Sequence, residues 1–286
     1  MSDDLLALTR QPWHWEWVPT VRPGEPAPEA WIERLAALFE EWTSEGMAAA
    51  RAAWPADAGA EFPFTSEMLG RDAARWLLER ADGLPAWTRL AWGAAFVNGR
   101  PRWAPVPVVV EFTGPVTGDP NYLMHLVGAR GMEGDAREPV VDYVTTSIGD
   151  GLRVFALCRS EEGAAYARVH AALRLDVPPT GGAPSVGIDV TLTTLVFEMG
   201  LMALIGNGVE QLMQQIADEC APTDGGPARL GFTAATEVAV TEAAATEAAV
   251  TEAAVTEVAV TEAAVTEAAV TEAAVTEVAA TGGGPA

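Results

Sequence analysis

The chain of 286 residues has no lysine, and all 17 of its basic residues are arginines. A Schiff-base nucleophile and a Gly-Lys-Ser/Thr phosphate loop both need lysine, so these two chemistries are excluded. Forty acidic residues bring the net charge to −23 at pH 7. Because such a surface repels phosphate groups, we expect neither nucleic acid nor anionic lipid headgroups as partners.

Cysteine and histidine are also scarce. Cys158 and Cys220 are the only thiols, a number that suits a reducing cytosol as well as one disulfide. No His-x-x-x-His or Cys-x-x-Cys spacing occurs, so we predict no metal site. Gly-x-Ser-x-Gly does not occur, and "GNGVEQ" at 206–211 follows a helical pattern rather than the strand of a dinucleotide fingerprint. We therefore predict no cofactor, and the balance is against an enzyme.

Long apolar runs are missing too. The most apolar stretch, residues 195–205, has eleven residues and includes Glu198, whereas a membrane-spanning helix needs about twenty. The start, "MSDDLLALTR", has neither the basic segment nor the apolar segment of a signal peptide. Frequent Arg, Ala, Gly and Pro are typical of a GC-rich bacterial genome. We expect a soluble bacterial protein of the cytoplasm, without membrane insertion.

Composition divides the chain into a Trp-rich extended arm (1–28), an α+β domain (29–232) and an acidic tail (233–286). In the arm, Trp13, Trp15 and Trp17 alternate and would share one face of an extended chain. They form either an interaction strip for a partner or an anchor into the core.

The tail repeats the unit Thr-Glu-Ala-Ala-Val nine times from Thr236 to Ala280. A helix is possible, but the five-residue period smears the valines around every side, so no apolar stripe forms. The phase Ala-Ala-Val-Thr-Glu loosely resembles that of pentapeptide-repeat proteins, which implies a β-solenoid. Nine units would give about two coils, too few to bury a core. A solvated low-complexity segment, disordered or transiently helical, is the third alternative.

Within the domain, the pattern predicts helices first (29–85), then a mainly antiparallel sheet meander (88–196), then closing helices (197–220). Helical spacing indicates helices over 29–51 and 66–81, with Thr65 as the N-cap of the second. In the closing part, Asn207 is the predicted cap of the last helix, whose apolar face is Val209, Leu212, Met213 and Ile216.

The sheet part opens with a hairpin around Asn98-Gly99. Its second strand carries Pro101, Pro105 and Pro107, which predicts an edge position or a bulge. Further strands are predicted at 122–128, 140–146, 152–159, 165–177 and 185–194. In strand 165–177 the side chains of Ala167, Val169, Ala171, Leu173, Leu175 and Val177 alternate with those of Tyr166, Arg168, His170, Arg174 and Asp176. This predicts one buried side and one wet or partner-facing side.

Two registers follow from this alternation. Pairing Ser160 with Ala165 would place Cys158 on the buried side and His170 on the other, which argues against a thiol–imidazole catalytic pair. Pairing Val177 with Val186 would place Arg174 opposite Asp189.

The polar side of the predicted sheet supplies the candidate ligand-binding residues. Arginine forks suit carboxylates and phosphates, so this face could bind a small anionic ligand or an acidic partner; plain cross-strand ion pairing is the alternative. The candidates are Arg153, Phe155, Arg159, Tyr166, Arg168, His170 and Arg174. The leading interpretation is a non-catalytic protein-binding or assembly module, and the alternative is an anionic-ligand binder or enzyme that uses this Arg/His face. The pattern names no partner, ligand, reaction or oligomeric state.

Overall fold

The computed structural model of the protein describes residues 12–20, 29–55, 61–85, 87–97, 100–101, 105–116, 118–160, 162–177 and 185–221. The predicted tail and most of the predicted arm lie outside these residues. The helices and strands, in chain order, are β1 (Trp13–Trp17), α2 (Glu29–Ala53), α3 (Ser66–Asp82), β2 (Thr88–Val97), β3 (Arg100–Pro101), β4 (Val106–Thr113), α4 (Tyr122–Leu126), β5 (Val140–Thr146), β6 (Gly149–Arg159), β7 (Ala165–Val177), β8 (Val186–Val196), α5 (Met199–Met202) and α6 (Ile205–Cys220). The predicted α+β class is confirmed.

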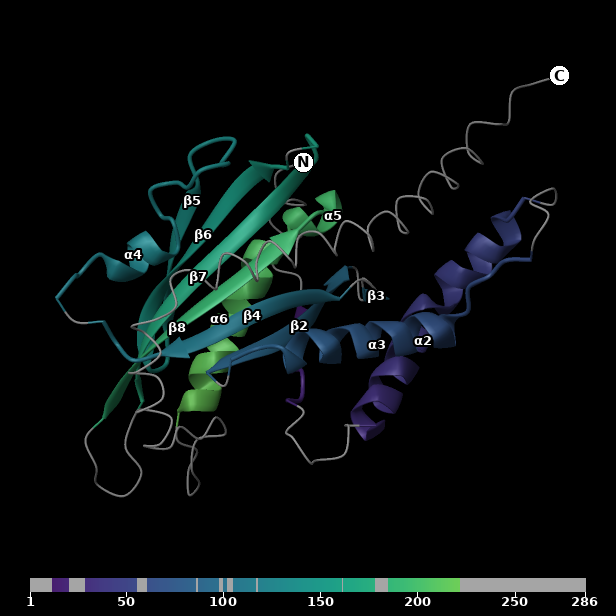
Figure 1. Ribbon diagram of the computed structural model, residues 1–286, viewed down its shortest axis with the longest axis horizontal. Coiled ribbons are helices and arrows are strands. Elements are labelled where there is room, and N and C mark those ends of the chain that lie inside the picture. The colour runs from purple at the N-terminus through teal and green to yellow at the C-terminus, as the bar shows by residue number, and fades with distance from the viewer. Residues whose placement is uncertain are drawn as a thin grey trace.

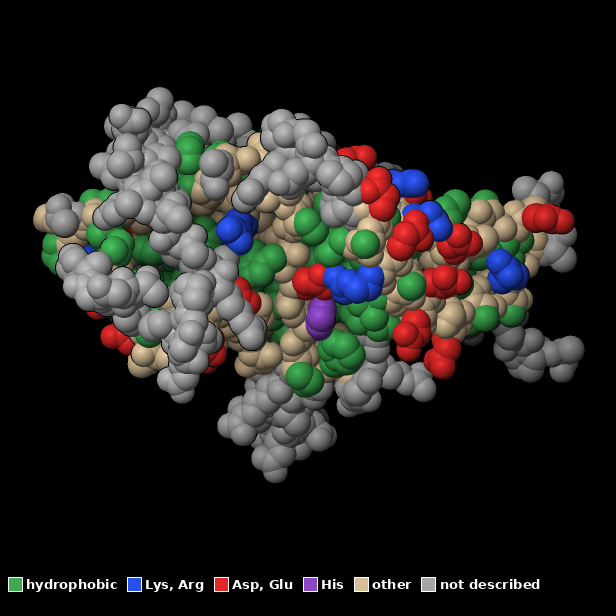
Figure 2. Space-filling view, turned by 90° about the horizontal axis from the view of Figure 1, so that it is seen from below, with side chains coloured by type: hydrophobic (Ala, Val, Ile, Leu, Met, Phe, Trp, Pro, Cys, Tyr) green, Lys and Arg blue, Asp and Glu red, His purple; other side chains and the backbone are tan. Residues whose placement is uncertain are grey.

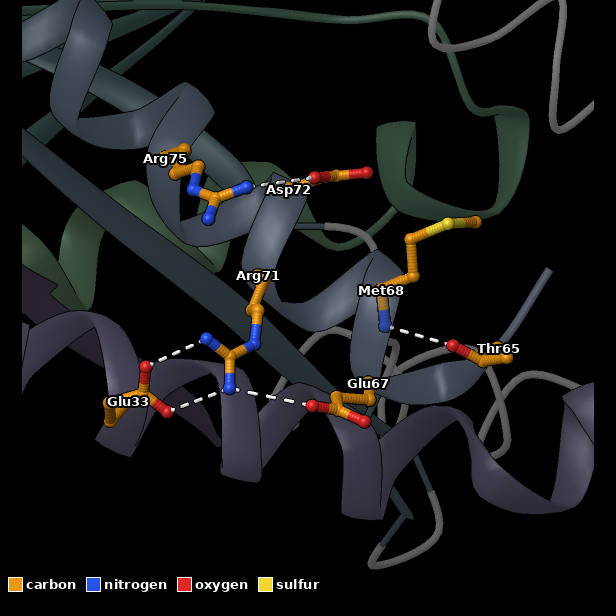
Figure 3. Close-up of polar contacts among 7 residues, drawn as sticks. All are labelled: Glu33, Thr65, Glu67, Met68, Arg71, Asp72 and Arg75. Atoms are coloured by element: carbon orange, nitrogen blue, oxygen red, sulfur yellow. Dashed lines mark hydrogen bonds and ion pairs between the residues drawn. The ribbon is translucent and has the colours of Figure 1, made fainter.

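Helices α2 and α3 form a hairpin that projects from one end of the sheet (Figure 1). The Thr65 side chain accepts a hydrogen bond from the backbone N–H of Met68 at 3.1 Å, so the predicted N-cap of α3 is confirmed. Between the helices, Arg71 of α3 donates to both carboxylate oxygens of Glu33 of α2, at 2.9 and 3.1 Å, and also contacts Glu67 (Figure 3). Leu35, Phe39 and Leu77 are among the buried apolar residues of the hairpin.

The strands form one antiparallel sheet in the order β1-β2-β4-β8-β7-β6-β5, with the short β3 paired to β2. It consists of two antiparallel runs, β1-β2-β4 and β5-β6-β7-β8, joined where β4 pairs with β8. Strands predicted at 140–146 and 165–177 are confirmed to the residue as β5 and β7. Figure 1 shows the long strands β6, β7 and β8 side by side.

Each side of the sheet is covered by different helices. On one side, here called the α6 face, Leu212, Met213 and Ile216 of α6 pack on alternate residues of the central strands. The opposite side, the α4 face, is covered in two places. The α2–α3 hairpin packs on Leu90 and Trp92 of β2, and α4 packs on β6 and β7 at the far end of the sheet. Because neighbouring residues of a strand face opposite sides, both sides of the sheet contribute to the core.

Two predictions about the elements are wrong, and for a third only one of its two alternatives holds. Residues 122–126 form the short helix α4 instead of a strand, because an apolar run this short fits either structure. The proline-containing strand β4 lies between β2 and β8 rather than at an edge. Its register is offset from that of β3 by two residues, since Val97 pairs with Arg100 whereas Gly93 pairs with Val106, and this offset agrees with the other predicted alternative, a bulge. Asn207 lies inside α6, whose N-cap is Leu204.

In the part of the chain that the structure describes, no helix has both the length and the apolar character to cross a membrane.

Candidate functional site

The seven predicted site residues do not share one face of the sheet, because the β6–β7 register differs by one residue from the predicted one. Arg159, not Ser160, pairs with Ala165, and Cys158 pairs with Tyr166. A shift of one residue turns a whole strand over, so the predicted single Arg/His face is wrong. Three of the seven residues lie on the α6 face, Arg153, Phe155 and Arg159; the other four lie on the α4 face, Tyr166, Arg168, His170 and Arg174.

Arg153 joins β6 to the start of α6. Its Nη2 lies 2.6 Å from Asp142 Oδ2 on β5, and its Nη1 lies 3.3 Å from Glu210 Oε2 on α6 and also donates to the carbonyl oxygen of Gly206. Only 13% of the Arg153 side chain is exposed. With three acceptors around it, this guanidinium fixes the helix to the sheet. Its neighbour Phe155 packs partly buried against the same core.

Arg168 is the second arginine that is buried and paired with a carboxylate of the same chain. The residue is 8% exposed, because the segment that follows α4 covers this part of the sheet. Its Nη2 lies 2.7 Å from Oδ1 of Asp135, whose side chain is 6% exposed. The backbone of Asp135 forms a bridge with Cys158, and its Oδ2 accepts the N–H of Met132. The predicted wet side of β7 is therefore wrong at this position.

His170 lies on the same covered part of β7. Burial, together with the nearby charge of Arg168, lowers the pKa of His170 to about 4, although a hydrogen bond with the backbone of Val127 acts in the opposite direction. The imidazole is therefore neutral at pH 7. Its Nε2 is buried and has no hydrogen-bond partner among the described residues.

A catalytic pair of Cys158 and His170 does not form. Tyr166, which pairs with Cys158, is four residues from His170 along β7, a distance of about 13 Å. Burial raises the pKa of the Cys158 thiol, and the hydrogen bond that the thiol donates to Asp135 Oδ1 at 3.4 Å also favours the protonated form. The thiol is therefore a weak nucleophile at neutral pH.

Arg174 is the third arginine held by a carboxylate. As predicted, it lies opposite Asp189. Its Nε and Nη2 lie 2.7 Å from Oδ1 and Oδ2 of Asp189, a bidentate pair. The Asp189 side chain is fully buried, whereas 42% of the Arg174 side chain is exposed. This guanidinium therefore already forms an internal ion pair, and an anionic ligand would have to compete with Asp189 for it.

The predicted tryptophan strip is an anchor into the core. Trp13, Trp15 and Trp17 share the α6 face as predicted, but the first two are 9% and 8% exposed. The Trp15 indole donates to the carbonyl oxygen of Gly208 on α6 at 2.9 Å, and the Trp17 indole donates to Glu219 at 2.6 Å. These indoles are covered by α6, so they do not form a surface for a partner.

A pocket of about 240 Å³ lies on the α4 face between α4 and strands β5 to β7. Its apolar lining comes from Leu123 and Met124 of α4 and Leu152 of β6. Tyr143 of β5 forms one wall, and the remaining lining residues are polar, small or conformationally rigid: Asp119, Pro120, Asp150, Gly151 and Arg174. Two carboxylates beside an aromatic ring favour a cationic ligand over an anionic one.

The outer edge of β5 adjoins this pocket. In the described sheet, β5 is the last strand and pairs with β6 on one side. Tyr143 is 77% exposed, and Val140, Leu126 and Met132 are between 44% and 48% exposed. The sequence predicts β5 itself but does not indicate that it lies at an edge, which is why these residues were not among the predicted site.

The described part of the chain contains no group of three or more His, Cys, Asp or Glu side chains that could hold a metal ion. Comparison of the chain with family models, with curated proteins and with solved structures gave no match, so geometry and charge are the grounds for any functional conclusion.

Proposed function

We propose that this chain is a non-catalytic protein-binding or assembly module, and that it binds an extended segment of a partner along β5. One observation carries this proposal: among the described strands, β5 lies at the edge of the sheet and has exposed apolar side chains, led by Tyr143 at 77% exposure. An edge strand presents unpaired N–H and C=O groups, and an extended peptide can add to it as a further strand.

The two ends of the sheet differ in a way that supports β5 as the binding edge. At the opposite end, β1 has five residues, and the backbone N–H of Trp13 donates to the Gln211 side chain at 3.0 Å. Strand β5 has seven residues, and although Gln214 of α6 donates to the carbonyl oxygen of Thr145 at 2.8 Å, its Tyr143 side chain is exposed, whereas Trp13 and Trp15 of β1 are buried. Its one charged residue, Asp142, is paired with Arg153.

Charge indicates the kind of partner. Residues 118–150, which contain α4, β5 and the connecting segments, include two arginines and six acidic residues, of which Asp135 and Asp142 are paired with arginines of β7 and β6. Figure 2 shows that acidic side chains also outnumber basic ones on the visible surface of the α2–α3 end. A basic partner is therefore favoured, both in the rate of association and in specificity.

The alternative function, an anionic-ligand binder or enzyme, has less support. Arg153, Arg168 and Arg174 each face carboxylates at 2.6–2.7 Å, so an anion would have to displace an internal partner from each. The pocket on this side of the sheet is lined by Asp119 and Asp150, which repel anions.

Affinity capture of partners with the full chain tests the proposal. Tyr143→Arg places a bulky cation on the binding edge. We expect it to weaken capture of any stoichiometric partner by at least about 30-fold, the effect of losing a typical hot spot. Met199→Arg is the matched control, because Met199 is 80% exposed and lies at the start of α5. Equal capture by Tyr143→Arg and the unaltered chain would refute binding at β5.

A further inference from the structure

We propose that the pocket beside Tyr143 binds one basic side chain, arginine or lysine, of the segment that pairs with β5. The inference rests on the proposed function and adds to it the chemistry of the partner. It combines three observations: the size of the pocket, the charges of its walls, and its position relative to the open edge.

Size limits the occupant. The volume of about 240 Å³ lies below the range of roughly 300–1,000 Å³ that is usual for small-molecule sites. A pocket of this size has room for one long side chain or a comparably small amine. The apolar surface of Leu123, Met124 and Leu152 suits the methylene stem of arginine or lysine, while the face of the Tyr143 ring attracts the cationic end.

The charges of the lining select a cation. Arg174, the one base in the lining, is already neutralised by its bidentate pair with Asp189. Asp119 accepts the N–H of Asn121 at 2.8 Å and lies 3.5 Å from His125. In the described part of the chain no arginine forms an ion pair with Asp119 or Asp150. Both carboxylates therefore lack an arginine partner in the described part of the chain and can accept hydrogen bonds from an incoming guanidinium or ammonium group.

Position explains why the side chain must be long. A residue of an added strand that lies opposite Tyr143 would have its Cβ about 5 Å from that of Tyr143 and would point to the same face. Its backbone would lie about 10 Å from β6, the strand that carries Asp150, since neighbouring strands are about 4.8 Å apart. Arginine and lysine can cross this gap to meet the aspartate, whereas short side chains cannot.

A fluorine label on tyrosine provides the test, because the chain has three tyrosines. The full chain is labelled with 3-fluorotyrosine, and the Tyr143 signal is assigned with the Tyr143→Phe variant. The probe is N-acetyl-arginine amide, and N-acetyl-citrulline amide is its uncharged counterpart at matched ionic strength. We expect a saturable shift of the Tyr143 signal at about 1–10 mM arginine probe and none with the citrulline probe.

Two variants separate a specific site from general attraction by an acidic protein. Asp150→Asn should weaken probe binding at least about five-fold, an effect in the usual range for losing a charge-assisted contact. Glu133→Gln, which removes an exposed charge outside the pocket, should leave binding unchanged. The inference is overturned if both variants act equally, if the citrulline probe shifts Tyr143 as much, or if no shift occurs up to about 100 mM.

This experiment needs no partner, so its failure differs from failure of the proposed function. If the probe does not bind while Tyr143→Arg abolishes partner capture, the edge remains the binding surface and the pocket is rejected. If the probe binds while Tyr143→Arg leaves capture intact, the assignment of the pocket to a β5-bound segment is wrong.

Discussion

The pair formed by Arg174 and Asp189 allows a sharp test, because its two members differ in exposure. The Asp189 side chain is fully buried and the Arg174 side chain is 42% exposed. Arg174→Met leaves a buried carboxylate with no cation, whereas Asp189→Asn leaves a guanidinium that can turn to water. The arginine substitution should therefore be the more damaging of the two.

Magnitudes follow from this difference. Removing one partner of a fully buried ion pair costs about 3–5 kcal/mol. Solvent reaches Arg174, so the pair is partly screened, and we expect Arg174→Met to lower the free energy of unfolding by about 2–3 kcal/mol at pH 7. Asp189→Asn keeps an acceptor for the N–H of Val116, which lies 3.3 Å from Asp189 Oδ2, and should cost about 1 kcal/mol.

Urea unfolding followed by tryptophan fluorescence measures both variants. Arg159→Met, which alters an exposed arginine at the end of β6, should stay within about 0.5 kcal/mol of the unaltered chain. The reasoning fails if Asp189→Asn costs as much as Arg174→Met.

Three further outcomes are expected. Gly208→Ala should lower the free energy of unfolding by about 1–3 kcal/mol despite the better helix propensity of alanine, because an added Cβ would lie 2.5 Å from the Trp13 ring. Gly46→Ala, which adds a Cβ in open space on α2, should raise it by about 0.5–1 kcal/mol. Urea unfolding measures both changes. Both cysteines are buried, and burial raises the pKa of Cys220 to about 12, so an Ellman titration at pH 8 should detect two thiols only after unfolding. The pKa of His170 is about 4 in the folded chain and about 6.5 in the unfolded chain, so the unfolded chain binds more protons between these pH values. The free energy of unfolding should therefore fall as the pH drops from 6.5 to 4. In urea unfolding curves, His170→Asn should make this pH dependence weaker.

The success of the β7–β8 register prediction and the failure of the β6–β7 prediction have one physical explanation. Strand β7 alternates clearly between apolar and polar residues, and only one register of β7 against β8 places Arg174 opposite Asp189, where the two charges attract. Strand β6 has apolar residues on both sides, for example Val154 and Phe155, since α4 and α6 cover opposite faces of the sheet. Alternation cannot choose a register for a strand that is buried on both sides.

The length of the turn between β6 and β7 sets the register of these two strands. The structure leaves five residues, 160–164, between Arg159 and Ala165, whereas the predicted pairing of Ser160 with Ala165 leaves four. Both connections are common in hairpins, and Gly163, which has a φ of +89°, can occupy a left-handed position in either. One residue of turn length therefore moved three of the seven predicted site residues to the other side of the sheet.

The pocket could not be predicted, because it depends on contacts between elements distant in sequence. Its walls come from α4, β5, β6 and β7, and α4 itself was predicted as a strand. The individual lining residues look ordinary in the sequence: an exposed tyrosine and two aspartates in an acidic chain. Only the sheet order, which makes β5 an edge, gives Tyr143 its significance.

Arginine clusters are weak predictors of anion sites in a chain of this composition. Even without the nine glutamates of the tail repeat, 31 acidic residues accompany the 17 arginines, so folding can supply most arginines with a carboxylate. Five arginines of the described residues pair with carboxylates from another part of the fold: Arg34 with Glu16, Arg71 with Glu33, Arg153 with Asp142 and Glu210, Arg168 with Asp135, and Arg174 with Asp189. The net charge that remains is negative. In an acidic protein without lysine, the charged groups that are free to bind a partner are therefore mostly carboxylates, which attract cations. This is why we infer a basic side chain for the pocket beside Tyr143.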